Sequence, residues 1–149
     1  MVDLMLLLTD YGYISLFVTS FLASTILPLG SEGLLVLMVL GNFNVHSVVL
    51  VASIANFLGA CTSYYIGLKG RTLLISKYMK ISDKQLKRAE AYFGKYGAIS
   101  LFFTWLPGIG DAIAVAGGVL HYSFSQFVIF VFLGKLFRYA AVAYFAIQI

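Results

Sequence analysis

Two carboxylates stand in comparable places in this 149-residue chain, each four residues after the proline of a Leu-Pro pair. Residues 27–32 have the sequence LPLGSE, which ends in Glu32, and residues 106–111 have the sequence LPGIGD, which ends in Asp111. A carboxylate deep in hydrocarbon costs at least about 2.5 kcal/mol, so it must be paired with a cation or protonated. We therefore expect Glu32 and Asp111 to pair with buried cations or to exchange protons.

Two cations in the last apolar stretch could provide these partners. Lys135 and Arg138 are three residues apart, which places both on one face of a helix, with Tyr139 beside them. They could pair with the carboxylates or bind an anionic phosphate group. The alternative is that their long side chains reach the membrane surface. Lys135 lies 12 residues after Ser123, roughly 18 Å at 1.5 Å per helical residue, and this depth favours pairing or phosphate binding.

The two Leu-Pro segments are poorly suited to plain lipid-facing helices. Proline removes a helical hydrogen bond, and the freed backbone groups must find partners in protein or in a water-lined cavity. We therefore expect each segment to form the tip of a re-entrant hairpin. The alternative is a helix that ends in the headgroup region. The residues expected at the two tips are Pro28, Gly30, Ser31, Pro107, Gly108 and Gly110.

Other polar residues are sparse. Asn56, Tyr64 and Tyr139 could line a polar path, although Asn56 and Tyr64 could equally form hydrogen bonds between helices. No His-Glu-x-x-His, Gly-x-Ser-x-Gly or phosphate-binding glycine loop is present, and there is a single cysteine. We therefore expect no catalytic residues, no metal site and no cofactor, and we do not expect an enzyme.

Composition and charge indicate a membrane protein. Hydrophobic residues make up 61% of the chain and charged residues 11%, compared with roughly 25% charged in soluble domains. Residues 69–95 hold eight of the ten Lys and Arg residues and two acids. A basic loop between apolar stretches is typical of a cytoplasmic loop, so we expect no nucleic-acid partner. Ser82 and Gln85 fit a helix capping box, which predicts an amphipathic helix on the membrane surface or a helical connector.

An internal repeat organises the chain. Residues 11–17, YGYISLF, return as residues 96–102, YGAISLF, with six of seven positions identical. The predicted fold is an all-α membrane domain over residues 1–149, with repeat 1 at about 11–67, the basic loop at 69–95 and repeat 2 at about 96–148. If each repeat is a re-entrant hairpin followed by one transmembrane helix, the second enters from the opposite face. That is the inverted repeat of many transporters.

Several segments resemble the YqaA-like branch of the DedA superfamily, which shares the VTT, or SNARE-associated, domain. They are LPLGSEG at 27–33, NFLG at 56–59, YYIG at 64–67, FTWLPGIGD at 103–111 and GKLFRY at 134–139. The resemblance implies a multi-pass protein of the bacterial inner membrane with two facing re-entrant segments. It also implies relatives linked to lipid scrambling or flipping and to proton-dependent transport.

The chain departs from the family pattern at one point. Better-studied members of the superfamily have two arginines flanking the second proline, and Thr104 and Gly110 stand at the matching positions here. We hypothesise that Lys135 and Arg138 supply the positive charge from the following helix.

The expected function is therefore membrane transport. The first hypothesis is a proton-coupled scramblase or flippase for an anionic phospholipid or a polyprenyl phosphate. The alternatives are a proton-coupled transporter of a small ion or solute, and a non-transporting assembly factor that recruits a partner through the basic loop. Expected partners are membrane lipids, protons or other ions, and further copies of the chain in a homo-oligomer such as a dimer.

Overall fold

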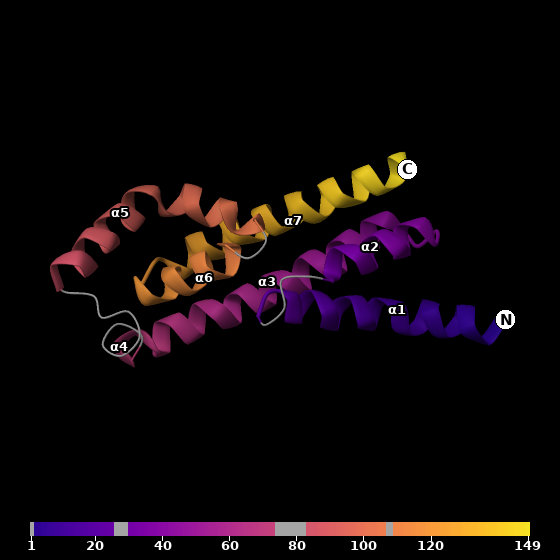
Figure 1. Cartoon of the computed structure of the whole chain (residues 1–149), viewed down its shortest axis with the longest axis horizontal. Helices are drawn as coiled ribbons and strands as arrows, with labels where there is room; N and C mark the ends of the chain where they lie inside the picture. Colours follow the sequence, from indigo (N-terminus) through magenta and orange to yellow (C-terminus); the bar gives the residue numbers. More distant parts are fainter. Residues whose placement is uncertain (1, 26–29, 74–82, 107–108) are drawn as a thin grey trace. The chain divides into compact units, whose positions relative to one another are not determined.

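The chain is described from a computed structural model that covers residues 2–25, 30–73, 83–106 and 109–149. All regular structure in these residues is helical, which confirms the all-α prediction (Figure 1). Pro28, Pro107, Gly108 and the capping box at Ser82 lie outside the described residues. The elements are α1 (Val2–Ala23), α2 (Ser31–Leu40), α3 (Val45–Lys69), α4 (Arg71–Leu73), α5 (Asp83–Phe102), the 3₁₀ turn η2 (Phe103–Trp105), α6 (Ile109–Val119) and α7 (Phe124–Gln148).

Two of these helices are long and apolar enough to cross a membrane. α3 and α7 each contain 25 residues, and about 20 suffice for the hydrocarbon core. Large apolar side chains on both helices are exposed, which suits contact with lipid better than contact with water. Examples are Leu50, Ile54 and Leu58 on α3 and Ile129, Leu133 and Phe137 on α7.

The turns that precede these two helices are built alike. In residues 37–43, three backbone N–H groups donate to carbonyls of the last turn of α2, and residues 116–122 form the same three bonds at the end of α6. Asn42 and His121 occupy the same place in the two turns, with φ of 64° and 54°. A left-handed residue with bonds of this pattern is a common way to end a helix. Asn42 and His121 are 79 positions apart, as are Glu32 and Asp111.

The described residues divide into two compact units. Unit 1 comprises Met1–Gly59 and Lys135–Ile149, and unit 2 comprises Ala60–Gly134. α3 and α7 therefore each contribute residues to both units. We describe each unit by itself.

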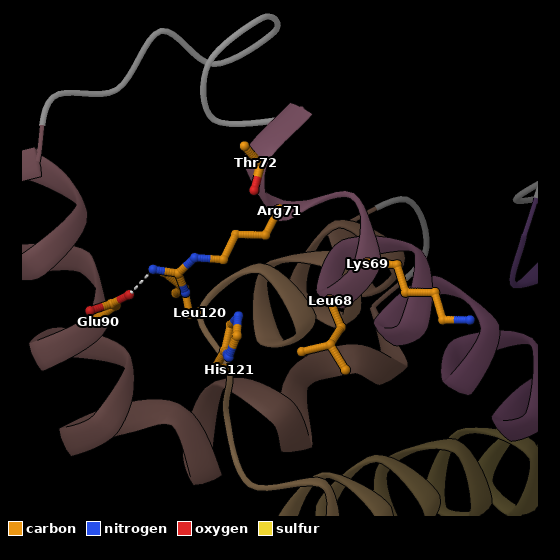
Figure 2. A pocket seen from close by; sticks show the side chains of 7 residues that line it. All are labelled: Leu68, Lys69, Arg71, Thr72, Glu90, Leu120 and His121. Atoms are coloured by element: carbon orange, nitrogen blue, oxygen red, sulfur yellow. Dashed lines mark hydrogen bonds and ion pairs between the residues drawn. The ribbon is translucent and has the colours of Figure 1, made fainter.

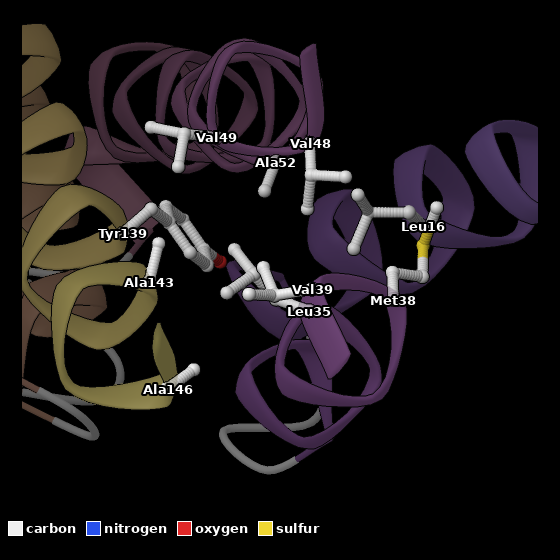
Figure 3. Packing of buried hydrophobic residues seen from close by; sticks show 10 residues of the cluster. All are labelled: Leu16, Leu35, Met38, Val39, Val48, Val49, Ala52, Tyr139, Ala143 and Ala146. Atoms are coloured by element: carbon white, nitrogen blue, oxygen red, sulfur yellow. The ribbon is translucent and has the colours of Figure 1, made fainter. Parts of the chain in front are cut away.

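Unit 1 has an apolar core built by four helices (Figure 3). The ring of Tyr139 on α7 lies between Val49 of α3 and Leu35 of α2. Leu16 of α1 lies against Met38 of α2. The full buried cluster is Leu16, Leu35, Met38, Val39, Val48, Val49, Ala52, Tyr139, Ala143 and Ala146. This core places α2 between α1 and α7, so the first turn of α2 is brought to the middle of α7.

Unit 2 depends on close backbone contact between α3 and α6. A Cβ atom added to Gly67 would lie 2.2 Å from the carbonyl oxygen of Val115, and one added to Gly118 would lie 1.9 Å from that of Tyr64. No real side chain tolerates such distances, so only glycine permits this approach. The contact holds α6, and with it the first turn that carries Asp111, against α3.

Arg71 ties a third helix to this pair (Figure 2). Its guanidinium donates to the carbonyl of Val119, one of the last carbonyls of α6, at 2.7 Å. It also pairs with Glu90 of α5 at 2.5 Å. Because the final carbonyls of a helix have no partner within the helix, Arg71 acts as a C-terminal cap that also positions α5.

Replacing Gly118 with alanine should destabilise the protein by about 2–3 kcal/mol, because the new methyl group would push α6 away from α3. The matched control is Gly94→Ala in α5 of the same unit, where no atom lies within 4 Å of an added Cβ. That change should be neutral or stabilise by about 0.5–1 kcal/mol, since alanine favours helix. Unfolding in detergent measures both. Equal stability of the two variants would show that the close contact does not exist.

Candidate functional site

The candidate site of unit 1 begins at the start of α2. Gly30 has φ of 132°, a conformation that side-chain-bearing residues rarely adopt, and its carbonyl accepts the N–H of Leu34 as α2 begins. Ser31 and Glu32 are therefore the first two residues of the helix. The unpaired amides of a first helical turn carry partial positive charge, which favours the Glu32 carboxylate at this place.

Glu32 forms an ion pair with Arg138 of α7. The side chains are only 25% and 13% exposed, and the guanidinium also lies 5.7 Å from the ring centroid of Tyr139. Arginine binds carboxylate and phosphate groups in the same planar manner. The structure therefore brings together two residues that the sequence analysis singled out, and it leaves their role in function as a prediction.

Ser31 and Tyr139 form a second link between α2 and α7. Their hydroxyl groups lie 2.9 Å apart, and both residues are fully buried. The Ser31 hydroxyl also lies 3.4 Å from Glu32 Oε2. Two adjacent residues of α2 thus contact two adjacent residues of α7, and we call Ser31, Glu32, Arg138 and Tyr139 the α2–α7 cluster. The Ser31–Tyr139 bond was not predicted, because neither residue type marks a pair in an apolar sequence.

Lys135 belongs to the same unit and is 2% exposed. It lies on α7 one turn before Tyr139. Its depth in the membrane stays a prediction. A buried cation, Lys135, and a largely buried one, Arg138, therefore occur within one turn of α7.

Asp111 belongs to unit 2 and lies in the first turn of α6, half-buried. Gly110 packs so closely against η2 that an added Cβ would lie 2.1 Å from the carbonyl oxygen of Thr104. The Thr104 hydroxyl donates to the Leu101 carbonyl at 2.7 Å. These contacts leave no room for an arginine at position 110 in this structure.

Asn56 and Tyr64 both form hydrogen bonds between elements. Asn56 Nδ2 donates to the Ser20 carbonyl of α1 at 2.8 Å, and the Tyr64 hydroxyl donates to the Tyr122 carbonyl at 2.5 Å. Their place on a polar path stays a prediction. In the described part of the chain, no three His, Cys, Asp or Glu side chains gather closely enough to hold a metal ion.

Comparison with known proteins identifies the family. Residues 27–148 match the VTT domain. The inner membrane protein YqaA of Escherichia coli is 36% identical over 136 residues, which cover 90% of each chain. An uncharacterized protein of Haemophilus influenzae is 32% identical over 140 residues, covering 87% of this chain and 83% of the relative.

A more distant relative carries a functional name. The undecaprenyl phosphate transporter A of Staphylococcus aureus is 26% identical over 144 residues, covering 85% of this chain and 68% of the relative. No solved structure matches the chain. The family match spans most of the sequence, and the Escherichia coli relative is named as an inner membrane protein. The chain therefore belongs to the VTT-domain, or DedA, family of membrane proteins.

Proposed function

We propose that this protein moves an anionic lipid, a phospholipid or a polyprenyl phosphate, across the membrane by binding its phosphate group at the α2–α7 cluster. The observation that carries the proposal is the Arg138 guanidinium, largely buried in an apolar protein and paired with Glu32. The Staphylococcus aureus relative, named an undecaprenyl phosphate transporter, supports this substrate class.

The Glu32 carboxylate binds the Arg138 guanidinium in the way that a phosphate group would. Carboxylate and phosphate oxygens accept the same charge-assisted bonds from arginine. A lipid phosphate that reaches Arg138 must therefore compete with Glu32. The Ser31 and Tyr139 hydroxyls, bonded to each other, lie beside the same pair, and Lys135 lies within one turn of Arg138 on α7. The lipid phosphate group binds when Glu32 releases Arg138.

Protonation of Glu32 supplies a means to control this step. A neutral carboxyl loses its ionic attraction to Arg138, and the guanidinium then needs another anion. Within the described residues, Glu32 contacts Ser31 on its own helix and Arg138 on α7. We propose Asp111, at the equivalent place in α6, as a second proton-exchanging group.

The transport architecture is part of the same proposal. We infer two re-entrant segments before α2 and α6, related by an inverted repeat, in a multi-pass protein with a cytoplasmic basic loop. A shared separation of 79 positions supports the repeat, since it relates Glu32 to Asp111, the two turns, and the first residues of α3 and α7. The seven-residue match at 11–17 and 96–102 is 85 positions apart, so the halves differ in length before the Leu-Pro pair. Such repeats let a transporter open alternately to each side of the membrane.

Reconstitution into liposomes with a fluorescent anionic lipid tests the function. The wild-type protein should move the labelled headgroup across the membrane. In the double variant Glu32→Gln with Arg138→Gln, the rate of this movement should fall at least about tenfold. The double change is preferred because removing Arg138 alone leaves a buried carboxylate unpaired, at roughly 3–5 kcal/mol. The double change keeps the net charge, and Lys87→Gln, which removes an exposed cation from α5, is the control for loss of a charge outside the cluster.

Wild-type activity in the folded double variant would contradict the proposal. Solute flux without lipid movement would instead favour a small-solute transporter. If the headgroup does not cross and Asp111→Asn leaves the cells unchanged, the assembly-factor alternative becomes the better account. Substitution of surface charges in the basic loop then tests that alternative.

Glu32→Gln alone should weaken the pH dependence of lipid movement, with Asp111 left as the second proton-exchanging group. Glutamine keeps the shape of the protonated acid and cannot regain the charge that holds Arg138. The measurement is the initial rate of headgroup movement between pH 5.5 and 8.5 in matched liposomes. An unchanged pH profile in this variant would rule out Glu32 as the controlling group.

The Ser31–Tyr139 bond should be measurable as a coupling energy. Ser31→Ala and Tyr139→Phe should each destabilise the protein by about 1–2 kcal/mol, because each leaves a buried hydroxyl without this partner. Since the two residues are in contact, the combined loss should fall short of the sum by about 0.5–1.5 kcal/mol. Unfolding of the four proteins in detergent gives this number, and strict additivity would contradict the contact.

A further inference from the structure

The carboxyl end of α1 meets a buried face of α3 in unit 1. Asn56 Nδ2 donates to the carbonyl of Ser20, which lies in the last turn of α1, at 2.8 Å. A Cβ added to Gly59 would lie 2.7 Å from the carbonyl oxygen of Phe21. α3 therefore presses its backbone against the final carbonyls of α1, which carry the partial negative charge of a helix C-terminus.

Three neutral side-chain oxygens on α1 and α3 have no hydrogen-bond partner within the described residues. They are Ser20 Oγ, Ser53 Oγ and Asn56 Oδ1, and each of these residues is at most 1% exposed. Ser53 and Asn56 are three residues apart on α3 and so share a face. Asn56 uses its nitrogen on Ser20, which leaves its oxygen as the atom available to a ligand. Buried polar atoms normally have partners, so the junction is suited to a small polar ligand.

The chemistry of the three atoms selects the class of ligand. All are oxygens, the donors that hard cations prefer, and they lie at the negative end of a helix. None is ionisable, so nothing in the set offsets a second positive charge, whereas Ca²⁺ and Mg²⁺ sites use carboxylates. Secondary transporters bind Na⁺ at the carboxyl ends of interrupted helices. These features favour a small monovalent cation.

The second half of the chain has a cation at the equivalent position. Asn56 and Lys135 are separated by the 79 positions that relate the two turns. Lys135 is a buried ammonium on α7, whereas Asn56 is a neutral amide on α3. At this equivalent position α7 therefore carries a positive charge of its own, whereas α3 presents an unpartnered oxygen.

We propose that Ser20, Ser53 and Asn56 bind Na⁺ at the carboxyl end of α1. The competing occupant is a buried water molecule, which can accept from the two serine hydroxyls and donate to the amide oxygen. Ion binding requires no lipid movement, so it can hold or fail independently of the lipid-transport function. If that function holds, the site supplies a coupling ion for it.

Purified protein in detergent tests the proposal with Na⁺ alone. The unfolding temperature is measured as NaCl replaces choline chloride at constant ionic strength, and binding of ²²Na⁺ is measured directly. Na⁺ should raise the unfolding temperature in a saturable manner, and excess Na⁺ should displace ²²Na⁺ more effectively than choline does. Equal effects of Na⁺ and choline, with no displaceable ²²Na⁺, would overturn the proposal and leave a buried water only.

Two conservative variants locate the site. Ser20→Ala and Ser53→Ala each remove one oxygen, so each should weaken Na⁺ binding at least about fivefold while the protein still unfolds cooperatively in choline. The matched control is Ser63→Ala, which changes another buried serine of α3 that lies in unit 2. It should keep wild-type affinity. Unchanged Na⁺ binding in both site variants, or equal loss in the control, would contradict the assignment.

Discussion

The ion pair between Glu32 and Arg138 is the constraint on which the rest of unit 1 depends. Neither charge is tolerable alone in an apolar interior, and loss of one partner costs roughly 3–5 kcal/mol. Other features of unit 1 serve to bring the two together. Gly30 allows α2 to begin at the right residue, the core seats the ring of Tyr139, and the Ser31–Tyr139 bond holds the same turn of α2 against α7.

The two halves of the chain have similar turns but different chemistry. By the separation of 79 positions, Gly59 is the equivalent of Arg138 in the other repeat, and Gly110 is the equivalent of Ser31. An added Cβ would lie 2.7 Å from the Phe21 carbonyl oxygen at Gly59 and 2.1 Å from that of Thr104 at Gly110, so neither place has room for a side chain. The second half therefore cannot repeat the α2–α7 cluster. Asp111 has a different setting from Glu32, and we expect the two acids to have unequal roles.

The sequence predicts the charged part of this site because buried charge is costly. Glu32 and Arg138 stand out in a chain that is 11% charged, and that cost alone predicts a pair. Neutral groups carry no such signal. The Ser31–Tyr139 bond depends on the register of two helices that are distant in sequence. In the sequence, Ser20 and Ser53 cannot be told from ordinary small residues of a helix, although their oxygens have no partner in the structure. The close contact at Gly118 likewise requires knowing which helix lies opposite.

The central claim is that a lipid phosphate takes the place of Glu32 on Arg138. Infrared difference spectroscopy of the reconstituted protein observes this exchange directly, with Glu32→Gln to assign the carboxyl band. Addition of an anionic lipid should shift the Glu32 band, as its ion pair with Arg138 is lost, and an uncharged lipid without a phosphate group should leave it unchanged. A Glu32 band that stays constant while the protein moves anionic lipid would contradict the account.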